Sequence, residues 1–506
     1  MELEHGEKTM KSKVTLLNMM SGFTLQFFTI VSGFIIPRII LTYFGSDVNG
    51  LISSLNQFLG YIGLLEGGIT GVIVANLYKP IVENDNSKIS SVLVTAKNFY
   101  NKIGILFIGY SVIVAFIYPL LVKSQFSYTY VWSLTLVLAI TLFIQYMFSL
   151  TLKTLLEADK KNYVVNFVQC AIVISNVVFA FMSVVIYPNV HILKLVSGVL
   201  FVFQPIAYKK FVDKNYKIDW NAKKDNSLIV SRWNGFAINF AAFIHNSTDI
   251  TILTICADLK MVSIYSVYCL VSNGLKQLIN ACLSGISNTV GQAYAKGNWK
   301  DVNLKLDIYE YIVFVLVFFL YTMAALLITP FVLLYTKGIT DTNYNQHIFG
   351  VLLCISEAMY LVKLPHLNLA YAANKFKEIT RPAYIEAGIN VIISVLLVGR
   401  FGVSGVAIGT IIAMTYRLVF HVHYTSCLIP ERKVGNFYKR MSLFVCGSLI
   451  SFFICSGIIE LNTLSIRNWI LHAVIYCVIV GSTFLVVSVI GFRKELRFLR
   501  EYMVRE

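Results

Sequence analysis

Long apolar stretches alternate with short polar segments along the whole chain. Each stretch approaches or exceeds the roughly 20 mostly apolar residues that a membrane-spanning helix needs. The pattern therefore predicts an all-α polytopic membrane protein with fourteen transmembrane helices. The predicted spans are Leu16–Ile40, Leu51–Leu77, Ile103–Val122, Val131–Leu152, Tyr163–Ile186, Ile192–Phe211, Ile229–Cys256, Val262–Val290, Ile308–Tyr335, Ile348–Ala373, Ile379–Val398, Val403–His423, Met441–Ile459 and Trp469–Ile490.

The order of these spans predicts two six-helix lobes followed by two additional helices. In each lobe the second helix is long and rich in polar residues, and it begins near Tyr43 in the first lobe and near Cys256 in the second. Paired six-helix lobes with a binding site at their interface are typical of transporters. We expect an N-terminal lobe at 1–212, a basic cytoplasmic linker at 213–226, a C-terminal lobe at 227–428, and two further helices with a basic tail at 429–506.

The positions of the charged residues give the orientation. The chain carries 42 Lys and Arg against 26 Asp and Glu, a net charge of +16. With a cytoplasmic N-terminus, and with residues near a span end assigned to the adjoining segment, 32 of the basic residues belong to the predicted inside segments, 7 to the outside segments and 3 to the interior of spans. Basic residues prefer cytoplasmic segments. The charge surplus therefore reports topology, and both ends of the chain are predicted to be cytoplasmic.

Composition excludes several classes of protein. The chain is 57% hydrophobic and 13% charged, whereas soluble domains carry about 25% charged residues. This excludes a nucleic-acid-binding protein, a secreted disulfide scaffold and a soluble oxidoreductase. The nine cysteines lie in apolar stretches without a C-x-x-C pair, so neither a metal site nor a redox centre is expected. Nucleotide-binding and hydrolase motifs are also lacking. We therefore expect no cofactor and no enzymatic activity, but transport driven by an ion gradient, by voltage or by the substrate's own gradient.

The longest polar interruption, Lys209–Ser227, holds six lysines between the sixth and seventh spans. One interpretation is a solvated linker that rests on anionic membrane lipids. The alternative is a docking site for a partner enzyme.

Ionisable residues inside predicted spans are candidates for function, because each costs about 2.5–3.5 kcal/mol to insert. In the seventh span Arg232, Asn239, Asn246 and Asp249 recur at helical spacing and share one face. Lys276 lies within a similar polar stripe on the eighth span. We expect these faces to line a wet cavity. The alternative is hydrogen bonding between packed helices, at about 0.6 kcal/mol per pair, which explains the asparagines more easily than the charges.

Two further spans carry charges. Glu357 and Lys363 in the tenth span are six positions apart, so they do not form an i,i+4 pair, and at least one needs a partner on another helix. His366 is interpreted as structural rather than as a proton relay. Arg417 and His421 are i,i+4 neighbours near the cytoplasmic end of the twelfth span, where we expect an interfacial position. Arg417 and Lys363 are nevertheless candidates for binding an anionic head group.

The first two spans contain Arg38 and Glu66. Arg38 either extends to the outer interface or binds phosphate oxygens with its planar guanidinium where a cavity closes. Glu66 lies among Gly63, Gly67 and Gly71, which form two overlapping G-x-x-x-G steps. These glycines predict a close helix approach or a bend. Glu66 is interpreted as the partner of a cavity arginine, with a proton or cation site as the alternative.

Two sequence runs resemble a known family. The first is Phe44-Gly45…Asn49-Gly50-Leu51…Gln57…Leu64-Leu65-Glu66-Gly67-Gly68…Leu77-Tyr78-Lys79-Pro80, and the second is Phe401–Gly409. Both are similar to the bacterial polysaccharide repeat-unit transporters. These are the O-antigen and capsule flippases of the multidrug/oligosaccharidyl-lipid/polysaccharide exporter superfamily. The resemblance implies export of an undecaprenyl-pyrophosphate-linked oligosaccharide from the inner to the outer leaflet of a bacterial plasma membrane. It also implies glycosyltransferases and a polymerase of the same pathway as partners, and a lipid tail bordered by the two additional helices.

The charges within the spans suggest a mechanism of transport. Cationic side chains between the lobes would attract the pyrophosphate while the lobes rock between inward and outward states. Moving two negative charges outward across about 100 mV releases roughly 4–5 kcal/mol, so voltage can drive the step without bound H⁺ or Na⁺.

A cation-coupled multidrug exporter should show unpaired carboxylates, but basic residues equal or exceed acidic ones on the predicted cavity helices. A lipid II flippase shares the fold and is not separated by sequence. A membrane glycosyltransferase or polymerase would need an outside loop longer than Thr336–His347.

Overall fold

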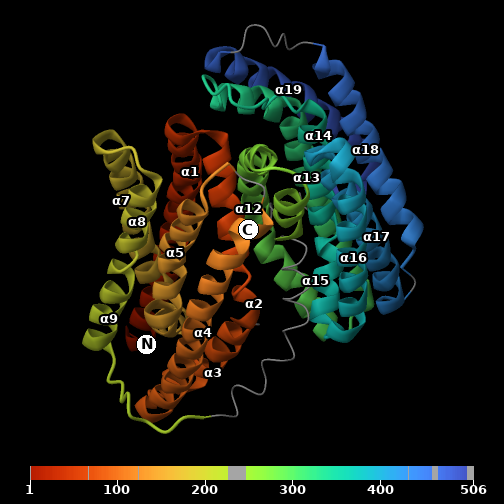
Figure 1. Ribbon diagram of the computed structural model, residues 1–506. Helices are drawn as coiled ribbons and strands as arrows, with labels where there is room; N and C mark the ends of the chain where they lie inside the picture. The colour runs from red at the N-terminus through yellow and green to blue at the C-terminus, as the bar shows by residue number, and fades with distance from the viewer. Residues whose placement is uncertain are drawn as a thin grey trace. The chain divides into compact units, whose positions relative to one another are not determined.

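The computed structural model describes residues 2–66, 68–122, 125–225, 247–430, 432–457 and 465–497 (Figure 1). In these ranges the ordered elements are helices, and no strand occurs. The chain divides into two compact units, Met1–Phe243 and Ile244–Glu506. The four-part division predicted from the sequence stays a prediction.

The first unit begins with a long helix that contains a kink. α1 extends through Gly45, whose φ of 83° and ψ of 178° are not helical, so the first span and the start of the second belong to one element. α1 packs against α7, and α4 packs against α5. The helices of this unit are α1 (Glu2–Gly60), α2 (Gly63–Glu66), α3 (Ile69–Val82), α4 (Asn86–Leu121), α5 (Tyr128–Ile144), a π-helical turn (Gln145–Ser149), α6 (Leu150–Ala158), α7 (Asn162–Ile186), α8 (Val190–Leu200) and α9 (Phe203–Asn215).

The predicted second span, Leu51–Leu77, is broken in the structure. α1 ends at Gly60 and α3 begins only at Ile69, after Gly68 in the left-handed conformation (φ 82°). The bend predicted from the glycines is therefore confirmed. The close helix approach is not found at Gly71, because a Cβ atom added there meets nothing within 4 Å.

Residues 216–225 of the basic linker lie along the start of α4 as an extended strap. The Asp219 amide donates to Ser90 Oγ (3.0 Å), Ser91 Oγ donates to the Lys223 carbonyl (2.6 Å), and Lys97 Nζ lies 4.8 Å from the Trp220 ring centroid. Side-chain hydroxyls of one helix thus fix the path of the strap. The exposed lysines of α9 and the strap are Lys209, Lys210, Lys214, Lys217, Lys223 and Lys224.

The second unit contains a tightly packed helix hairpin. α16 and α17 meet at Gly402 (φ 56°), and α17 approaches α16 closely at two glycines. A Cβ atom on Gly405 would lie 2.6 Å from the Leu397 carbonyl oxygen, and one on Gly409 would lie 2.9 Å from the Ser394 nitrogen. Besides the short helical segment Ser247–Cys256, the helices of this unit are α12 (Leu259–Ala295), α13 (Trp299–Tyr335), α14 (His347–Val362), α15 (Leu364–Ala372), α16 (Phe376–Phe401), α17 (Val403–Leu428), α18 (Val434–Ser456) and α19 (Ile466–Gly491).

The two additional helices, α18 and α19, pack against α13. Their interface is aromatic: the Phe444 ring centroid lies 5.7 Å from that of Phe314 and 5.4 Å from that of Phe484. Aromatic pairs at such distances contribute about 0.5–1.5 kcal/mol beyond their buried area. The additional helices are thus packed into the second unit.

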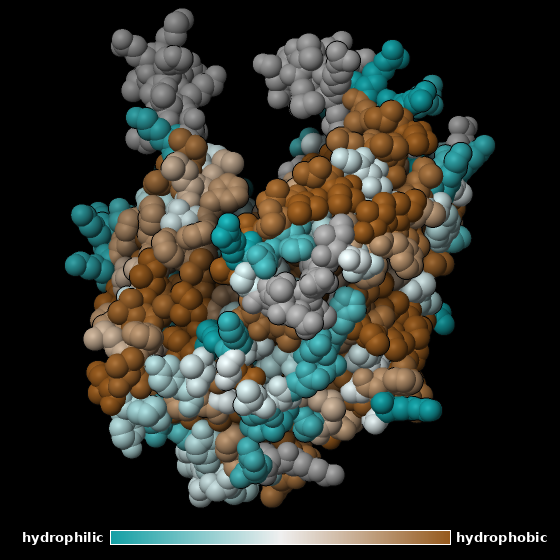
Figure 2. Space-filling view, turned by 90° about the horizontal axis from the view of Figure 1, so that it is seen from above, coloured by the Kyte–Doolittle hydropathy of each residue, from teal (hydrophilic) through white to brown (hydrophobic). Residues whose placement is uncertain are grey.

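Eleven helices in the described ranges are long and apolar enough to cross a membrane, so the predicted count of fourteen is not confirmed. The difference has three sources. The kinked segment Lys13–Glu66 counts once, α12 is too polar to be included, and most of the predicted seventh span lies outside the described residues. Large apolar side chains such as Leu396 (73% exposed) and Phe453 (74%) lie on the surface, and Figure 2 shows broad hydrophobic areas in brown. Lipid is the solvent that suits such a surface, so the chain is a multi-pass membrane protein.

Candidate functional site

Three predicted candidates gather around one tyrosine in the second unit. Lys276 Nζ on α12 lies 2.7 Å from Glu357 Oε2 on α14, and the two side chains are only 15% and 16% exposed. The expectation that Glu357 or Lys363 needs a partner on another helix is therefore confirmed. Lys276 Nζ also lies 4.7 Å from the ring centroid of Tyr360. The charge of Lys276 is thus balanced by a carboxylate and an aromatic face.

Lys363 occupies the break between α14 and α15 and is 3% exposed. Its Nζ lies 4.5 Å from the same Tyr360 ring and 3.5 Å from Met414 Sδ. In the described ranges no carboxylate comes within ion-pairing distance of this nitrogen. A buried charge without a partner is costly, and Lys363 is therefore suited to receive an anion.

Arg417 is buried, so the interfacial position expected for it is wrong. Its side chain is 7% exposed in α17, with Nη1 2.6 Å from Glu386 Oε2 on α16 and Nε donating to His421 Nε2 at 2.8 Å. Glu386 supplies a counter-charge inside the unit, and the arginine has no need to reach the membrane surface. Glu386 was not among the residues expected from the sequence, although Glu386 and Arg417 lie at nearly equal distances before and after the hairpin turn at Gly402.

Asp249 is also buried, at 9% exposure. Its Oδ2 accepts hydrogen bonds from the Tyr265 hydroxyl at 2.8 Å and from Thr410 Oγ1 at 3.2 Å. These bonds join the short helical segment Ser247–Cys256 to α12 and α17. Whether Asp249 couples transport to an ion stays a prediction.

The other predicted site residues are not part of this group. Arg232, Asn239 and Asn246 lie outside the described residues, so the predicted polar stripe is not tested. In the first unit, Arg38 is half-buried on α1. Glu66 accepts a hydrogen bond from Thr70, and the pairing with an arginine that we expected is not found in the described part of the chain.

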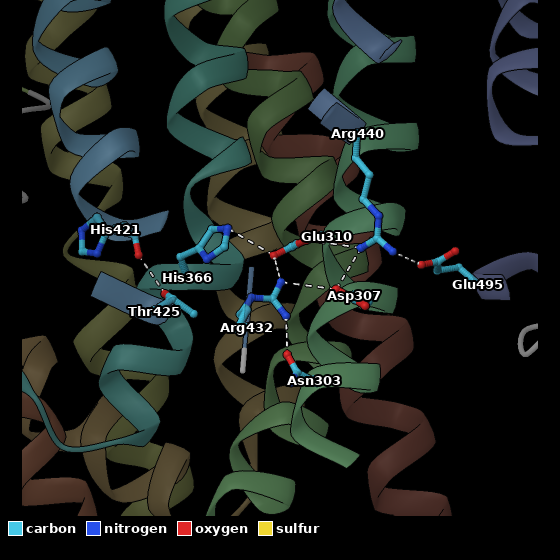
Figure 3. A network of polar contacts seen from close by, with 9 residues as sticks. All are labelled: Asn303, Asp307, Glu310, His366, His421, Thr425, Arg432, Arg440 and Glu495. Carbon is cyan, nitrogen blue, oxygen red and sulfur yellow. Dashed lines mark hydrogen bonds and ion pairs between the residues drawn. The ribbon is translucent and has the colours of Figure 1, made fainter. Parts of the chain in front are cut away.

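A second charged network, missed by the sequence analysis, surrounds Glu310 on α13 (Figure 3). Glu310 is 1% exposed and accepts a hydrogen bond from Arg432, which precedes α18. Arg440 in α18 lies 2.8 Å from Asp307 Oδ1 and also pairs with Glu495 beyond α19. The network thus fastens the ends of the two additional helices to α13.

The two arginines of this network are largely buried. Arg432 and Arg440 belong to the basic residues counted for the inside segments, and their side chains are 9% and 17% exposed. The acidic residues at the start of α13 draw them into the protein. His366, which we interpreted as structural, lies in the same network, with Nε2 3.3 Å from Glu310 Oε1 and its ring 4.9 Å from that of Phe437.

An apolar cavity of about 410 Å³ adjoins the helix that carries the charged group. It is lined by side chains of α13, α14, α17 and α18, including Tyr321, Met359 and Phe452. Glu357, Tyr360 and Lys363 belong to or end the same helix, α14, that contributes Met359. In this part of the second unit, α14 therefore carries charged groups and also lines an apolar cavity. Among the described residues no cluster of His, Cys, Asp and Glu is suited to hold a metal ion.

The fold was compared with known proteins. No protein-family model matches the sequence, and no curated protein sequence matches it. Solved structures do match. The lipid II flippase MurJ in its inward closed conformation is 14% identical, covers 95% of this chain and 100% of its own, and gives a TM-score of 0.68. The chain shares the fold of this structure.

Two MATE transporter structures agree with this result. An inward-facing MATE family transporter of the MOP superfamily is 15% identical, covers 80% of this chain and 96% of its own, and gives a TM-score of 0.63. The eukaryotic MATE transporter AtDTX14 is 12% identical, covers 85% and 98%, and gives 0.59. The resemblance predicted from the sequence is therefore supported as far as the fold of the superfamily.

Proposed function

We propose that this protein is a flippase of the bacterial plasma membrane, with both ends in the cytoplasm. Its substrate would be a polyprenyl-pyrophosphate-linked oligosaccharide, carried from the inner to the outer leaflet. One observation carries the proposal: Lys363 is buried in a broken membrane helix without a carboxylate partner in the described ranges, and it shares the Tyr360 ring with Lys276. Broken helices at membrane depth are typical of transporter binding sites.

The energetics of Lys363 favour an anionic ligand. A lysine in the membrane core costs about 2.5–3.5 kcal/mol on insertion scales, and a bound pyrophosphate offsets part of that cost. The same anion competes with Glu357 for Lys276, whose ion pair measures 2.7 Å. Binding would release the Glu357 carboxylate, which then takes up a proton or a cation. Glu357 is therefore the residue at which ion coupling would act.

The apolar cavity supports a lipid-linked substrate. Its wall includes Phe452 and Phe453 of α18, one of the two additional helices. A polyprenyl chain requires an apolar surface of this kind, which a water-soluble sugar does not. Voltage is sufficient for the movement, because two negative charges crossing about 100 mV release roughly 4–5 kcal/mol.

A lipid II flippase is the second candidate, and the fold match to MurJ over 95% of this chain favours it. Both candidates place a pyrophosphate at Lys363 and differ in the sugar. A multidrug exporter of cationic compounds is less well supported, because Glu357 and Glu386 are each paired with a basic residue.

Transport by the purified chain in liposomes tests the proposal. Three fluorescent substrates are compared: a polyprenyl-pyrophosphate-linked trisaccharide, lipid II, and an organic cation such as ethidium. We expect either both pyrophosphate lipids or the first alone to cross. Their transport should be faster when the membrane potential pulls anions in the outward direction. Transport of ethidium alone would contradict the proposal, and transport of lipid II alone would favour the second candidate.

A further inference from the structure

A second cavity, of about 450 Å³, lies within the first unit. Its walls come from α1, α3, α6 and α7. Four of the lining side chains are amides: Asn18, Asn162, Asn166 and Gln169. The proposed transport site in the second unit makes no use of it.

The charge of this cavity is balanced. Its basic residue, Lys153, lies 3.5 Å from its acidic residue, Glu157, one turn further along α6. Such an i,i+4 pair keeps both charges close to each other. The cavity therefore offers no excess charge to a phosphate or to an organic cation.

The amides define the ligand chemistry. An amide side chain has two N–H donors and a carbonyl acceptor. Asn18 and Asn166 use part of theirs within the unit, and sugar hydroxyl groups both donate and accept hydrogen bonds. The Tyr78 ring at the rim is 51% exposed. In the described ranges, neither the side-chain amide of Asn162 nor the hydroxyl of Tyr78 has a hydrogen-bond partner. Neutral saccharides fit this combination better than an apolar drug, which needs a mostly aliphatic lining.

The cavity is held open by bonds between helices. Asn18 Nδ2 donates to the Lys160 carbonyl (2.7 Å), and Asn18 Oδ1 accepts from the Tyr163 amide (2.8 Å). These bonds fix the turn between α6 and α7, where Lys160 adopts a left-handed φ of 57°. Asn166 Nδ2 donates to Ser21 Oγ at 3.0 Å. A non-glycine residue in this conformation persists only where its surroundings hold it, so the cavity wall is preorganised.

The far side of the same turn is fixed as well. Lys161 Nζ lies 2.7 Å from Asp159 Oδ2 and donates to the Tyr216 hydroxyl at 3.0 Å. The Tyr216 hydroxyl in turn donates to Asp159. Burial and this hydrogen bond to Asp159 raise the pKa of Tyr216, which keeps the donor protonated. The strap after α9 and the turn beside the cavity are therefore locked together.

We propose that this cavity binds a neutral saccharide of about two rings, the size that a cavity in the range of about 300–1,000 Å³ admits. The segments around the lining residue Tyr78 and around the turn at Lys160 are predicted to be cytoplasmic. The site would hold the sugar of the lipid-linked substrate before transport. This last step rests on the proposed function, whereas binding of a free neutral sugar does not.

Saturation-transfer difference NMR on the full chain in nanodiscs tests the site. The probes are N,N′-diacetylchitobiose and maltose, with glucose 6-phosphate as the charged probe and empty nanodiscs as the background. We expect signal from at least one neutral disaccharide and a weaker signal from the phosphate. Asn162→Ala and Tyr78→Ala should each weaken binding about fivefold, the loss of one hydrogen bond of about 1 kcal/mol.

Asn176→Ala is the matched control, because Asn176 lies on α7 outside the cavity. It should leave the signal unchanged. The inference is overturned if neither disaccharide binds, or if Asn162→Ala and Asn176→Ala behave alike. Tyr78 is exposed, so Tyr78→Ala keeps the test valid where an asparagine variant fails to fold. If no disaccharide binds but the protein transports the lipid-linked substrates in liposomes, this inference alone is refuted. If a disaccharide binds but no lipid-linked substrate is transported, the proposed function alone is refuted.

Discussion

The buried pair Glu386–Arg417 makes the sharpest stability prediction. Glu386→Gln removes the carboxylate that lies 2.6 Å from Arg417 Nη1, in a site where the two side chains are only 4% and 9% exposed. The guanidinium keeps His421 as an acceptor at 2.8 Å but loses its counter-charge. We expect the protein to unfold more easily.

The magnitude follows from the burial. Breaking a buried ion pair by removing one partner costs about 3–5 kcal/mol, because the remaining charge is left uncompensated. Replacing both partners with apolar residues is often neutral or stabilising. Glu386→Leu combined with Arg417→Met should therefore recover most of the loss caused by Glu386→Gln.

Unfolding of the detergent-solubilised chain by increasing amounts of sodium dodecyl sulfate, followed by tryptophan fluorescence, measures the effect. The matched control is Glu378→Gln on the same helix, α16. Glu378 pairs with Lys375 at 3.6 Å, but both side chains are more than 40% exposed. Exposed pairs contribute about 0–1 kcal/mol, so this variant should stay close to the wild type.

Equal stabilities of Glu386→Gln and Glu378→Gln would refute the reasoning. It would mean that Arg417 reaches water or lipid head groups without Glu386, as the interfacial interpretation requires. A double variant less stable than Glu386→Gln alone would refute the charge argument and point to packing instead.

Three further predictions concern helix packing, capping and the Glu310 network. Gly409→Ala should destabilise the protein by about 1–3 kcal/mol through overpacking, and Gly71→Ala should not, as denaturant unfolding of both variants would show. A hydrogen bond from the Lys88 amide lowers the pKa of Asp85. This cap on α4 is fully present above the ordinary aspartate pKa and is lost as the pH falls through the lowered pKa of Asp85. Hydrogen exchange of the amides in the first turn of α4 should show this pH-dependent loss of protection in the wild type. The Asp85→Ala variant should not show it. Arg432→Met leaves Glu310 buried and should cost about 3 kcal/mol, with faster hydrogen exchange at the start of α18; unchanged exchange there would contradict the role of the network.

Hydrophobic periodicity and charge were sufficient to predict most of the helices. Predicted spans overlap, among others, the helices α4, α7, α13, α16, α17 and α19. The reason is that the membrane requires a similar length and a similarly apolar surface from each of them. The hydrophobic pattern could not predict the kink at Gly45. The glycine spacing predicted either a bend or a close helix approach before Ile69 and could not decide between them. Backbone conformation at a glycine leaves no trace in hydropathy, and the same G-x-x-x-G spacing occurs at a bend and at a contact.

The glycines illustrate this limit. Close helix approach was one expectation for Gly63, Gly67 and Gly71, of which Gly67 lies outside the described residues. A Cβ atom added at Gly63 or Gly71 meets nothing closer than 3.9 Å, whereas close approaches occur at Gly405 and Gly409. Both sets are spaced four residues apart. Only the second set lies in a hairpin whose partner helix presents its backbone to the glycines. Spacing alone therefore predicts a small-residue face but not what packs against it.

The candidate site was predicted in part. Lys276, Glu357 and Lys363 were selected because charges within apolar spans are costly, and the structure brings them together around Tyr360. Glu310 was missed because it lies near the end of a predicted span, where inserting a carboxylate costs little free energy. Which residues pair across helices depends on helix rotation, and a single sequence does not contain that information.

The most direct test of the account is pyrophosphate-lipid transport by Lys363→Met in proteoliposomes, with Lys377→Met as the control. Lys377 is exposed on α16, whereas Lys363 is buried at the helix break. The account predicts that Lys363→Met loses at least about tenfold in transport, worth about 1.4 kcal/mol, while its unfolding stability is equal or higher, and that Lys377→Met transports normally. Undiminished transport by a folded Lys363→Met protein would contradict the central claim that this buried lysine binds the anionic head group.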